Sequence, residues 1–299
     1  MQTISAGQTK PKLVIVGCGT VGTAMAKLLK RSGYHISGVV TSRLETARAS
    51  AEATGADRYS ERPWELTPRG EVVFITTPDD MIAPVCREIA AHKGFRENMV
   101  VLHCSGALSS QILGPARDSG ASVATLHPLQ SFASIDQAIR LVPDSFCAVE
   151  GDEQALPIVH QIVEDVGGIL LEMTPEKKTL YHAAAVVASN YLVTLMGLAT
   201  ELNKSAGLSA DVSFSALLPL IKGTLSNIRL KGIPDALTGP IARGDVATLT
   251  AHLESLEMDV PEYLSLYRCL GLYTVEIAKE KGSISQETAV KLVELLRPS

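Results

Sequence analysis

The sequence predicts an α/β fold with a doubly wound, mostly parallel sheet, followed by an all-helical region. Three observations predict it. A glycine-spaced turn joins an apolar strand to a helix near residue 17, and short β-branched runs then alternate with helical segments as far as residue 172. This alternation is typical of a parallel sheet covered by helices on both faces. After residue 173 no strand-like run follows. We therefore expect a Rossmann domain in residues 1–172 and an all-α C-terminal domain in residues 173–299.

Length and charge narrow the class of protein. A chain of 299 residues is long enough for two domains, at about 100–200 residues each. The net charge is −5, and no basic block exceeds two residues, which argues against nucleic acid or an anionic membrane as a partner. The five cysteines lack C-x-x-C spacing, so we expect reduced thiols in a cytoplasmic protein, with no disulfide framework and no metal site.

Neither the N-terminus nor the most apolar stretch of the chain has the pattern of an export or membrane signal. The N-terminal residues 1–11 are polar and lack the apolar core of a signal peptide. Residues 180–202 are more apolar, but they include His182, Ser189, Asn190, Thr194 and Glu201. This composition predicts a buried helix and not a membrane span.

The turn after the first strand (residues 13–17) has the G-x-G-x-x-G spacing of a dinucleotide-binding fingerprint. Its residues are Gly17, Cys18, Gly19, Thr20, Val21 and Gly22. In such motifs the first glycine permits the tight turn, the second lets the backbone approach a pyrophosphate, and the third lets the helix pack on the strand. The helix N-terminus adds free N–H groups and a partial positive charge. An ordinary glycine-rich turn is the alternative, but the strand–turn–helix setting favours a dinucleotide site.

The second strand (residues 36–41) carries the choice between NAD and NADP. An NAD site usually has a carboxylate at its end, which binds the ribose 2′-hydroxyl. Here Ser42 and Arg43 follow the strand, and no carboxylate appears before Glu45. A hydroxyl and a guanidinium can both bind a 2′-phosphate, so we expect NADP. Arg43 as a solvated residue at the start of the next helix is the alternative.

Later strand ends bring further polar groups to the ligand-binding edge of the sheet. Thr76, Thr77 and Pro78 follow one strand, Ser105 follows the next, and we expect all four to contact the cofactor. His127 follows a further strand, and we expect it to be a proton donor or a wall of the active site. A structural histidine bonded to a loop carbonyl is the alternative for His127, and it is the favoured interpretation for His103.

The long helix expected from residue 174 to about 206 supplies a second polar set. Steps of four, three and four residues place Lys178, His182, Ala185 and Ser189 on one face, with Asn190 beside them. We expect His182 and Asn190 to serve the substrate, and a satisfied buried histidine is the alternative for His182. Further helices are expected over 212–229, 245–257, 261–281 and 286–296. The third of these is apolar on more than one face, which fits a core helix or a subunit interface. Asp245 is expected to cap the second, whereas Arg243 is solvated or grips a substrate carboxylate.

The order of these motifs resembles a family of Rossmann-like proteins with a helical C-terminal domain of unknown function. The matching segments are residues 17–22, 103–106, 127–132, 181–185 with 189–190, and 238–245. The family is related in outline to pyrroline-5-carboxylate reductase, prephenate dehydrogenase and 3-hydroxyisobutyrate dehydrogenase. The resemblance implies a C-terminal domain of the 6-phosphogluconate-dehydrogenase-like type, NADP binding, oxidoreductase activity and a helical domain that often dimerises. It also makes Lys177 or Lys178, with Asn190, plausible counterparts of substrate-binding residues. The Pro-Gly-Gly-Thr-Thr signature of pyrroline-5-carboxylate reductases is missing, which argues against that activity.

We therefore expect an NADP-dependent oxidoreductase that acts on a small carbonyl, hydroxyl or imine substrate between the two domains. His127, His182 and Asn190 are the expected catalytic residues, and the partner is a second copy of the chain bound through the helical domain. A non-catalytic NADP sensor would keep the glycine motif without needing a proton-handling group. Hydride exchange with a deazaflavin would keep the same fold and change only the second substrate.

Overall fold

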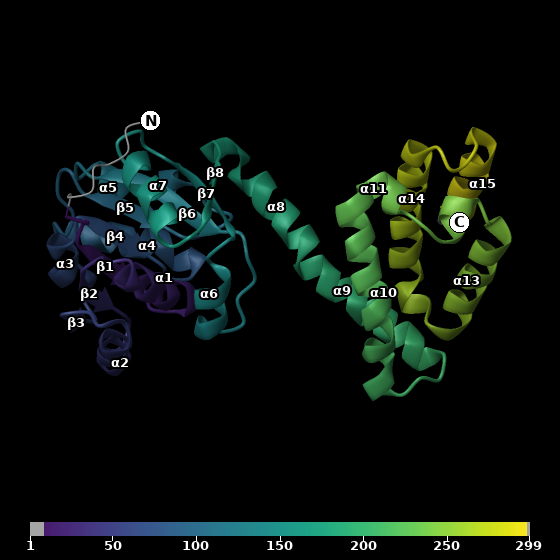
Figure 1. Cartoon of the computed structure of the whole chain (residues 1–299), viewed down its shortest axis with the longest axis horizontal. Helices are drawn as coiled ribbons and strands as arrows, with labels where there is room; N and C mark the ends of the chain where they lie inside the picture. Colours follow the sequence, from purple (N-terminus) through teal and green to yellow (C-terminus); the bar gives the residue numbers. More distant parts are fainter. Residues whose placement is uncertain (1–8, 298–299) are drawn as a thin grey trace. The chain divides into compact units, whose positions relative to one another are not determined.

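The computed structural model describes residues 9–297. The chain forms two compact units, Met1–Ser189 and Asn190–Ser299. The sheet and the helices that cover it belong to the first unit, and the second unit is helical (Figure 1).

One eight-stranded sheet forms the centre of the first unit. Its spatial order is β3-β2-β1-β4-β5-β6-β7-β8, and all neighbouring strands are parallel except β6 and β7. The strands are β1 (Leu13–Val16), β2 (Ile36–Val40), β3 (Tyr59–Ser60), β4 (Val72–Ile75), β5 (Val100–His103), β6 (Ser122–Pro128), β7 (Phe146–Gly151) and β8 (Ile169–Glu172). The predicted doubly wound, mostly parallel sheet is confirmed.

Helices cover both faces of this sheet, because its central strands are apolar on both sides. In β1, Leu13 and Ile15 belong to one buried cluster, whereas Val14 and Val16 belong to the other. The helices are α1 (Thr20–Arg31), α2 (Leu44–Thr54), α3 (Pro63–Leu66), α4 (Asp79–Ala91), α5 (Gly114–Arg117), α6 (Ile135–Leu141) and α7 (Leu156–Asp165). Short 3-10 turns lie at η1 (Thr67–Arg69) and η2 (Ser110–Leu113). The segment between α2 and β4 contains β3 and α3.

The helix expected to run unbroken from residue 174 to about 206 is interrupted. A 3-10 turn, η3 (Pro175–Lys177), leads into α8 (Lys178–Ala188), and α9 (Asn190–Ser205) follows. Between them Ser189 has φ −115° and ψ −68°, outside the usual helical range. The two units meet at this point, so α8 groups with the sheet, although the change in sequence character lies near residue 173.

The prediction that residues 180–202 form a buried helix is wrong. In α8 and α9 only Lys178 and Leu198 are buried, whereas Leu180 and Val193 are 71% and 72% exposed. The first unit covers only the face of α8 that carries Lys178, Tyr181 and His182, so its other apolar side chains stay open. Within the described residues, one helical stretch, Pro175–Ser205, is long and apolar enough to cross a membrane, which by itself is weak evidence for a span.

The second unit contains the helices predicted over 212–229, 245–257, 261–281 and 286–296, the last part of the helix expected from residue 174, and two short helices, at 233–236 and 240–243, that were not predicted. They are α9, α10 (Ala210–Lys231), α11 (Ile233–Ala236), α12 (Pro240–Arg243), α13 (Val246–Asp259), α14 (Leu264–Lys281) and α15 (Gln286–Leu296), with a 3-10 turn at η4 (Pro261–Tyr263). Leu249 of α13, Val275 of α14 and Leu292 of α15 are fully buried in its core. Tyr273 of α14 is 71% exposed, so α14 has both a core face and an open face.

Candidate functional site

The turn between β1 and α1 is shaped by its three glycines. Gly17 has φ +97°, and a Cβ there would lie 2.7 Å from backbone atoms of Thr76 and Thr77. At Gly22 a Cβ would lie 2.2 Å from the Gly17 carbonyl oxygen and 2.4 Å from Thr76 Oγ1. Gly19 differs, because a Cβ there would meet nothing within 4 Å. The first and third glycines therefore permit close packing, and the second leaves its backbone open to a ligand.

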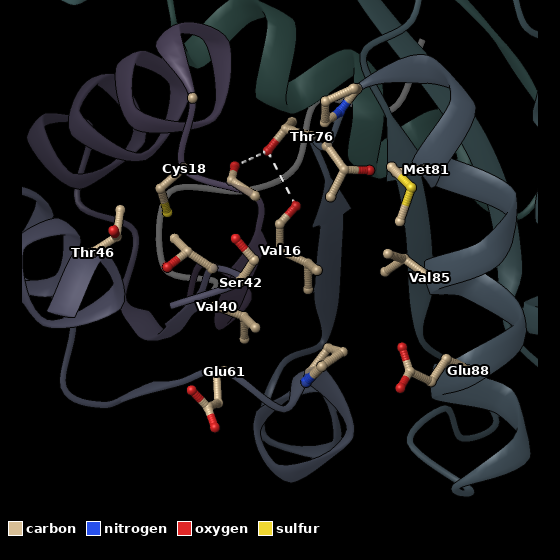
Figure 2. Close-up of a pocket in the computed structure, with 16 residues that line it drawn as sticks. Val16, Cys18, Val40, Ser42, Thr46, Glu61, Thr76, Met81, Val85 and Glu88 are labelled. Atoms are coloured by element: carbon tan, nitrogen blue, oxygen red, sulfur yellow. Dashed lines mark hydrogen bonds between the residues drawn. The ribbon is translucent and has the colours of Figure 1, made fainter. Parts of the chain in front are cut away.

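A cavity of about 560 Å³ opens beside this turn (Figure 2). It is bounded by the carboxyl ends of β1, β2 and β4 and by one side of α4. The lining residues are Val16, Gly17, Cys18, Gly19, Val40, Thr41, Ser42, Thr46, Glu61, Pro63, Thr76, Thr77, Pro78, Met81, Val85 and Glu88. Seven of the residues predicted to bind cofactor are among them: Gly17, Cys18, Gly19, Ser42, Thr76, Thr77 and Pro78.

The chemistry of this cavity suits a phosphate-containing ligand. The N-terminus of α1, a helix of 12 residues with no acidic side chain in its first turn, begins directly after Gly19. Such an end offers free N–H groups and a partial positive charge. The buried Thr77 Oγ1 has no hydrogen-bond partner among the described residues, so this hydroxyl is free to bind a ligand. The thiol of Cys18 has its pKa raised by burial to about 11, so it stays protonated at neutral pH.

The remaining predicted cofactor residues lie outside the lining. Thr20 begins α1, and Val21 packs against the core. Arg43 is exposed at the N-cap of α2, next to the lining residue Ser42. Ser105 is buried and its hydroxyl donates to Asp79 Oδ2 at 2.7 Å.

Two carboxylates of the cavity were not predicted from the sequence. Glu61 and Glu88 both contribute to its lining, and Figure 2 shows them beyond Val40 and Val85. They belong to no motif, because Glu61 follows β3 and Glu88 lies in the C-terminal half of α4. These two carboxylates would repel a 2′-phosphate, so that group would be favoured on the Ser42 side of the cavity.

A second group of polar residues forms around His127 at the end of β6. His127 Nδ1 lies 3.1 Å from the Tyr181 hydroxyl, and the rings of His127 and His182 cross edge to face with centroids 6.2 Å apart. Gly106 is buried against both imidazoles, since a Cβ there would lie 2.8 Å from His127 Nε2 and 2.6 Å from His182 Nδ1. The structure thus brings together His127 and His182, two of the three predicted catalytic residues.

The protonation of this group follows from its environment. Burial, then the charges of Lys178 and His182, lower the pKa of His127 to about 4. Burial raises the pKa of Tyr181 to about 12. At neutral pH, therefore, His127 is a neutral imidazole and Tyr181 keeps its proton. His182 Nδ1 is buried and has no hydrogen-bond partner among residues 9–297.

The other candidates fall into distinct environments. His103 is fully buried, with Nε2 3.2 Å from the Ser109 carbonyl and Nδ1 accepting from Ser105 N at 3.2 Å, which fits a structural histidine. Lys177 is exposed, whereas Lys178 is fully buried. Asn190, the third predicted catalytic residue, is exposed and begins α9 in the second unit, so the structure does not bring it together with His127.

Two functional candidates were missed. Tyr181 directly precedes His182. It lies three residues after Lys178, about one turn of helix, so it shares the buried face of α8. That spacing was available in the sequence, but only the structure shows the contact with His127. Gly106 is the last residue of the segment 103–106. Its importance comes from its contact with two imidazoles that are distant from it in the sequence. In the second unit Asp245 caps α13 as predicted, because its carboxylate accepts from Thr248 N at 3.0 Å.

Family models match both parts of the chain. Residues 3–128 match a Rossmann-like domain, and residues 145–274 match a domain of unknown function, DUF2520. No protein among the curated sequences matches this chain. The family predicted from the sequence motifs is confirmed.

Solved structures resemble the chain over nearly its whole length. Protein TM1727 from Thermotoga maritima is 30% identical, with a TM-score of 0.69, and the match covers 90% of this chain and 99% of that protein. A candidate NADP oxidoreductase from Bacteroides fragilis is 23% identical, with a TM-score of 0.71 and coverage of 92% and 99%. A reductive aminase from Aspergillus terreus, solved with NADPH and ethyl-5-oxohexanoate, is 20% identical, with a TM-score of 0.61 and coverage of 96% and 93%. At their lower identities, the last two show the shared fold.

Proposed function

Because the chain belongs to the family of Rossmann-like proteins that carry the DUF2520 domain, we propose that it is an NADP(H)-dependent oxidoreductase acting on a small carbonyl, hydroxyl or imine substrate. The observation that carries this proposal is the group formed by His127, Tyr181 and His182 in the same unit as the glycine-turn cavity. Similar structures support the cofactor, since a pyrroline carboxylate reductase from Plasmodium falciparum was solved with NADP bound. A sensor without chemistry would have no need of such a polar group.

The residues of the cavity fit NADP. The pyrophosphate would lie over Gly19 at the N-terminus of α1, and the Thr77 hydroxyl would donate to the cofactor. Ser42 and Arg43 would hold the 2′-phosphate, and Thr20, Val21 and Gly22 would support the turn. The nicotinamide supplies or accepts the hydride when NADP is bound.

His127 would act by hydrogen bonding and not as a charged acid. If the Tyr181 hydroxyl donates to His127 Nδ1, the ring proton of His127 lies on Nε2, the atom beside Gly106. A neutral imidazole N–H at that position polarises a carbonyl oxygen or an imine nitrogen as negative charge develops there. The unpartnered His182 Nδ1 would contact the same substrate group. Substrate binding between the two domains, with Asn190 taking part, stays a prediction.

The proposal is tested by following NADPH oxidation against keto acids, ketones and cyclic imines. With an active substrate, Tyr181→Phe should lower kcat about 10- to 100-fold and leave the NADPH Kd unchanged, because it removes only the hydroxyl that fixes the His127 tautomer. Tyr273→Phe is the matched control, since Tyr273 is 71% exposed and lies on α14.

Three other outcomes would contradict parts of this proposal. Tight NADPH binding without turnover of any substrate indicates a sensor. Turnover only after addition of a deazaflavin indicates hydride exchange between cofactors. Equal rates in Tyr181→Phe and the unmodified protein would remove the role of the His127 group.

A homodimer formed through the helical domain is part of the same proposal. The α9–α10 hairpin has only Leu198 and Ser213 buried, whereas Leu220, Leu225 and Leu230 are 67%, 52% and 70% exposed. Apolar patches of this kind mark association surfaces. A second copy is the favoured occupant because both helices are apolar along much of their length. Light scattering should give twice the mass of the chain, and Leu220→Glu should give the monomer mass.

A further inference from the structure

The most deeply buried charges of the first unit lie beside the His127 group and have no role in the chemistry above. Lys178 is fully buried and Glu150 is 2% exposed, with Nζ 3.7 Å from Glu150 Oε1. Nζ also donates to Thr125 Oγ1 at 2.5 Å. A buried ion pair contributes little net stability, because desolvation of both charges offsets their attraction. Its position in the fold is therefore the informative feature.

The pair connects four elements at one place. In the antiparallel ladder of β6 and β7, Thr125 lies directly opposite Glu150. Glu150 is held in turn by η2, since Oε1 accepts from Ser110 N and Oε2 from Ser110 Oγ, both at 2.7 Å. Lys178, the first residue of α8, reaches this cross-strand pair.

The same contacts determine where the His127 group forms. Thr125 and His127 are two residues apart in β6, so their side chains share a face of the sheet. Tyr181 and His182 lie three and four residues after Lys178, so they share its face of α8. Fixing Lys178 to Thr125 therefore brings the next turn of α8 against His127.

We propose that the Lys178–Glu150 pair is the positioning element of the candidate active site: it fixes the first turn of α8 to β6 and β7, so that Tyr181 and His182 lie against His127. The inference deepens the proposed function and rests on it for its effect on catalysis. The cation also acts on the ring itself, because its charge, after burial, lowers the pKa of His127. The other ionisable groups nearest to His127 are Tyr181 and His182 on α8, and His103 on β5 lies near the same cation.

The test removes both charges together. In Lys178→Met/Glu150→Gln the amide oxygen can still accept from Ser110, and the core loses no volume. We expect this variant to fold, to bind NADPH as before, and to show kcat lowered at least 10-fold. In NMR titrations the pKa of His127 should move upward, because the Lys178 charge that helps to lower it is gone. The signal of the Tyr181–His127 hydrogen bond should weaken. Lys291→Met is the matched control and should change none of these quantities, since the Lys291 side chain is 58% exposed on α15.

The NMR readout separates this inference from the proposed function. If no substrate is ever turned over, the hydrogen bond from Tyr181 to His127 still reports on positioning. An unchanged hydrogen-bond signal in the double variant would overturn the inference, whatever the pKa of His127. Loss of the folded state in that variant would also overturn it, because the pair would then be required for folding.

Discussion

The glycines of the β1–α1 turn allow cofactor binding and folding to be separated by two single-methyl changes. At Gly19 an added Cβ meets no atom within 4 Å, and the backbone angles of −73° and −163° are open to alanine. Alanine is a poorer N-cap than glycine, but it lowers the entropy of the unfolded chain, and the two effects of about 0.5–1 kcal/mol have opposite signs. We expect Gly19→Ala to leave the free energy of unfolding almost unchanged.

The same methyl should strongly weaken NADPH binding. It would occupy the space over which a pyrophosphate approaches the N-terminus of α1. Loss of a hydrogen bond to a charged group costs about 1.5–3 kcal/mol, which corresponds to about a 10- to 150-fold rise in Kd. Titration of NADPH fluorescence measures this change, and urea unfolding without cofactor measures stability.

Gly22→Ala should show the opposite pattern and serves as the comparison. Its Cβ would lie 2.2 Å from the Gly17 carbonyl oxygen, so α1 must move away from the strand. Overpacking of this kind costs about 1–3 kcal/mol, and the melting temperature should fall by roughly 2–4 °C for each kcal/mol. Full NADPH affinity in Gly19→Ala would refute placement of the pyrophosphate at this turn. Unchanged stability in Gly22→Ala would refute the close packing.

Three further predictions concern the 2′-phosphate, the imidazole pair and pH. Arg43→Ala should raise the NADPH Kd about 10- to 150-fold and leave the NADH Kd unchanged, and equal effects on both would exclude a 2′-phosphate contact. Gly106→Ala should reduce turnover without weakening NADPH binding, because its Cβ would lie 2.6–2.8 Å from the two imidazole nitrogens; wild-type rates would contradict the site. Burial lowers the pKa of both His103 and His127 from 6.5 to about 4, so the unfolded chain takes up protons first as pH falls. Their contribution to stability is therefore complete above pH 6.5 and is lost toward pH 4, by about 1.4 kcal/mol per pH unit for each histidine and about 2.8 kcal/mol per pH unit for the two together. Urea unfolding between pH 6.5 and 5 should show this combined slope in the unmodified protein and about half of it, roughly 1.4 kcal/mol per pH unit, in His127→Gln.

Much of the first unit follows from local sequence patterns. The alternation of β-branched runs and helices predicts the parallel sheet, and Gly17–Gly22 predicts the turn that borders the cavity. These features depend on residues close in sequence, where period and turn chemistry are decisive. The four long helices after residue 209, α10, α13, α14 and α15, were likewise predicted from their caps and apolar spacing, whereas the short helices α11 and α12 were not.

The contacts that assemble the polar group could not be predicted in this way. His127, Gly106 and Tyr181 come from three separate segments, and nothing in their spacing specifies that they meet. The break at Ser189 was not predicted either, because no glycine or proline lies beside it. The exposure of α8 and α9 was predicted wrongly. Apolar composition favours burial, but it does not identify the surface that would cover these helices.

The Lys178–Glu150 pair determines where this chain can be divided into separate domains. Truncation at residue 173, after which no further strand is predicted, would remove Lys178. Glu150 would then be a buried carboxylate without its counter-ion. A cut after Ser189 keeps that pair intact. Gene fusions and exchanges between relatives that respect the second boundary would transfer a complete N-terminal module, whereas those that follow the first would transfer a damaged one.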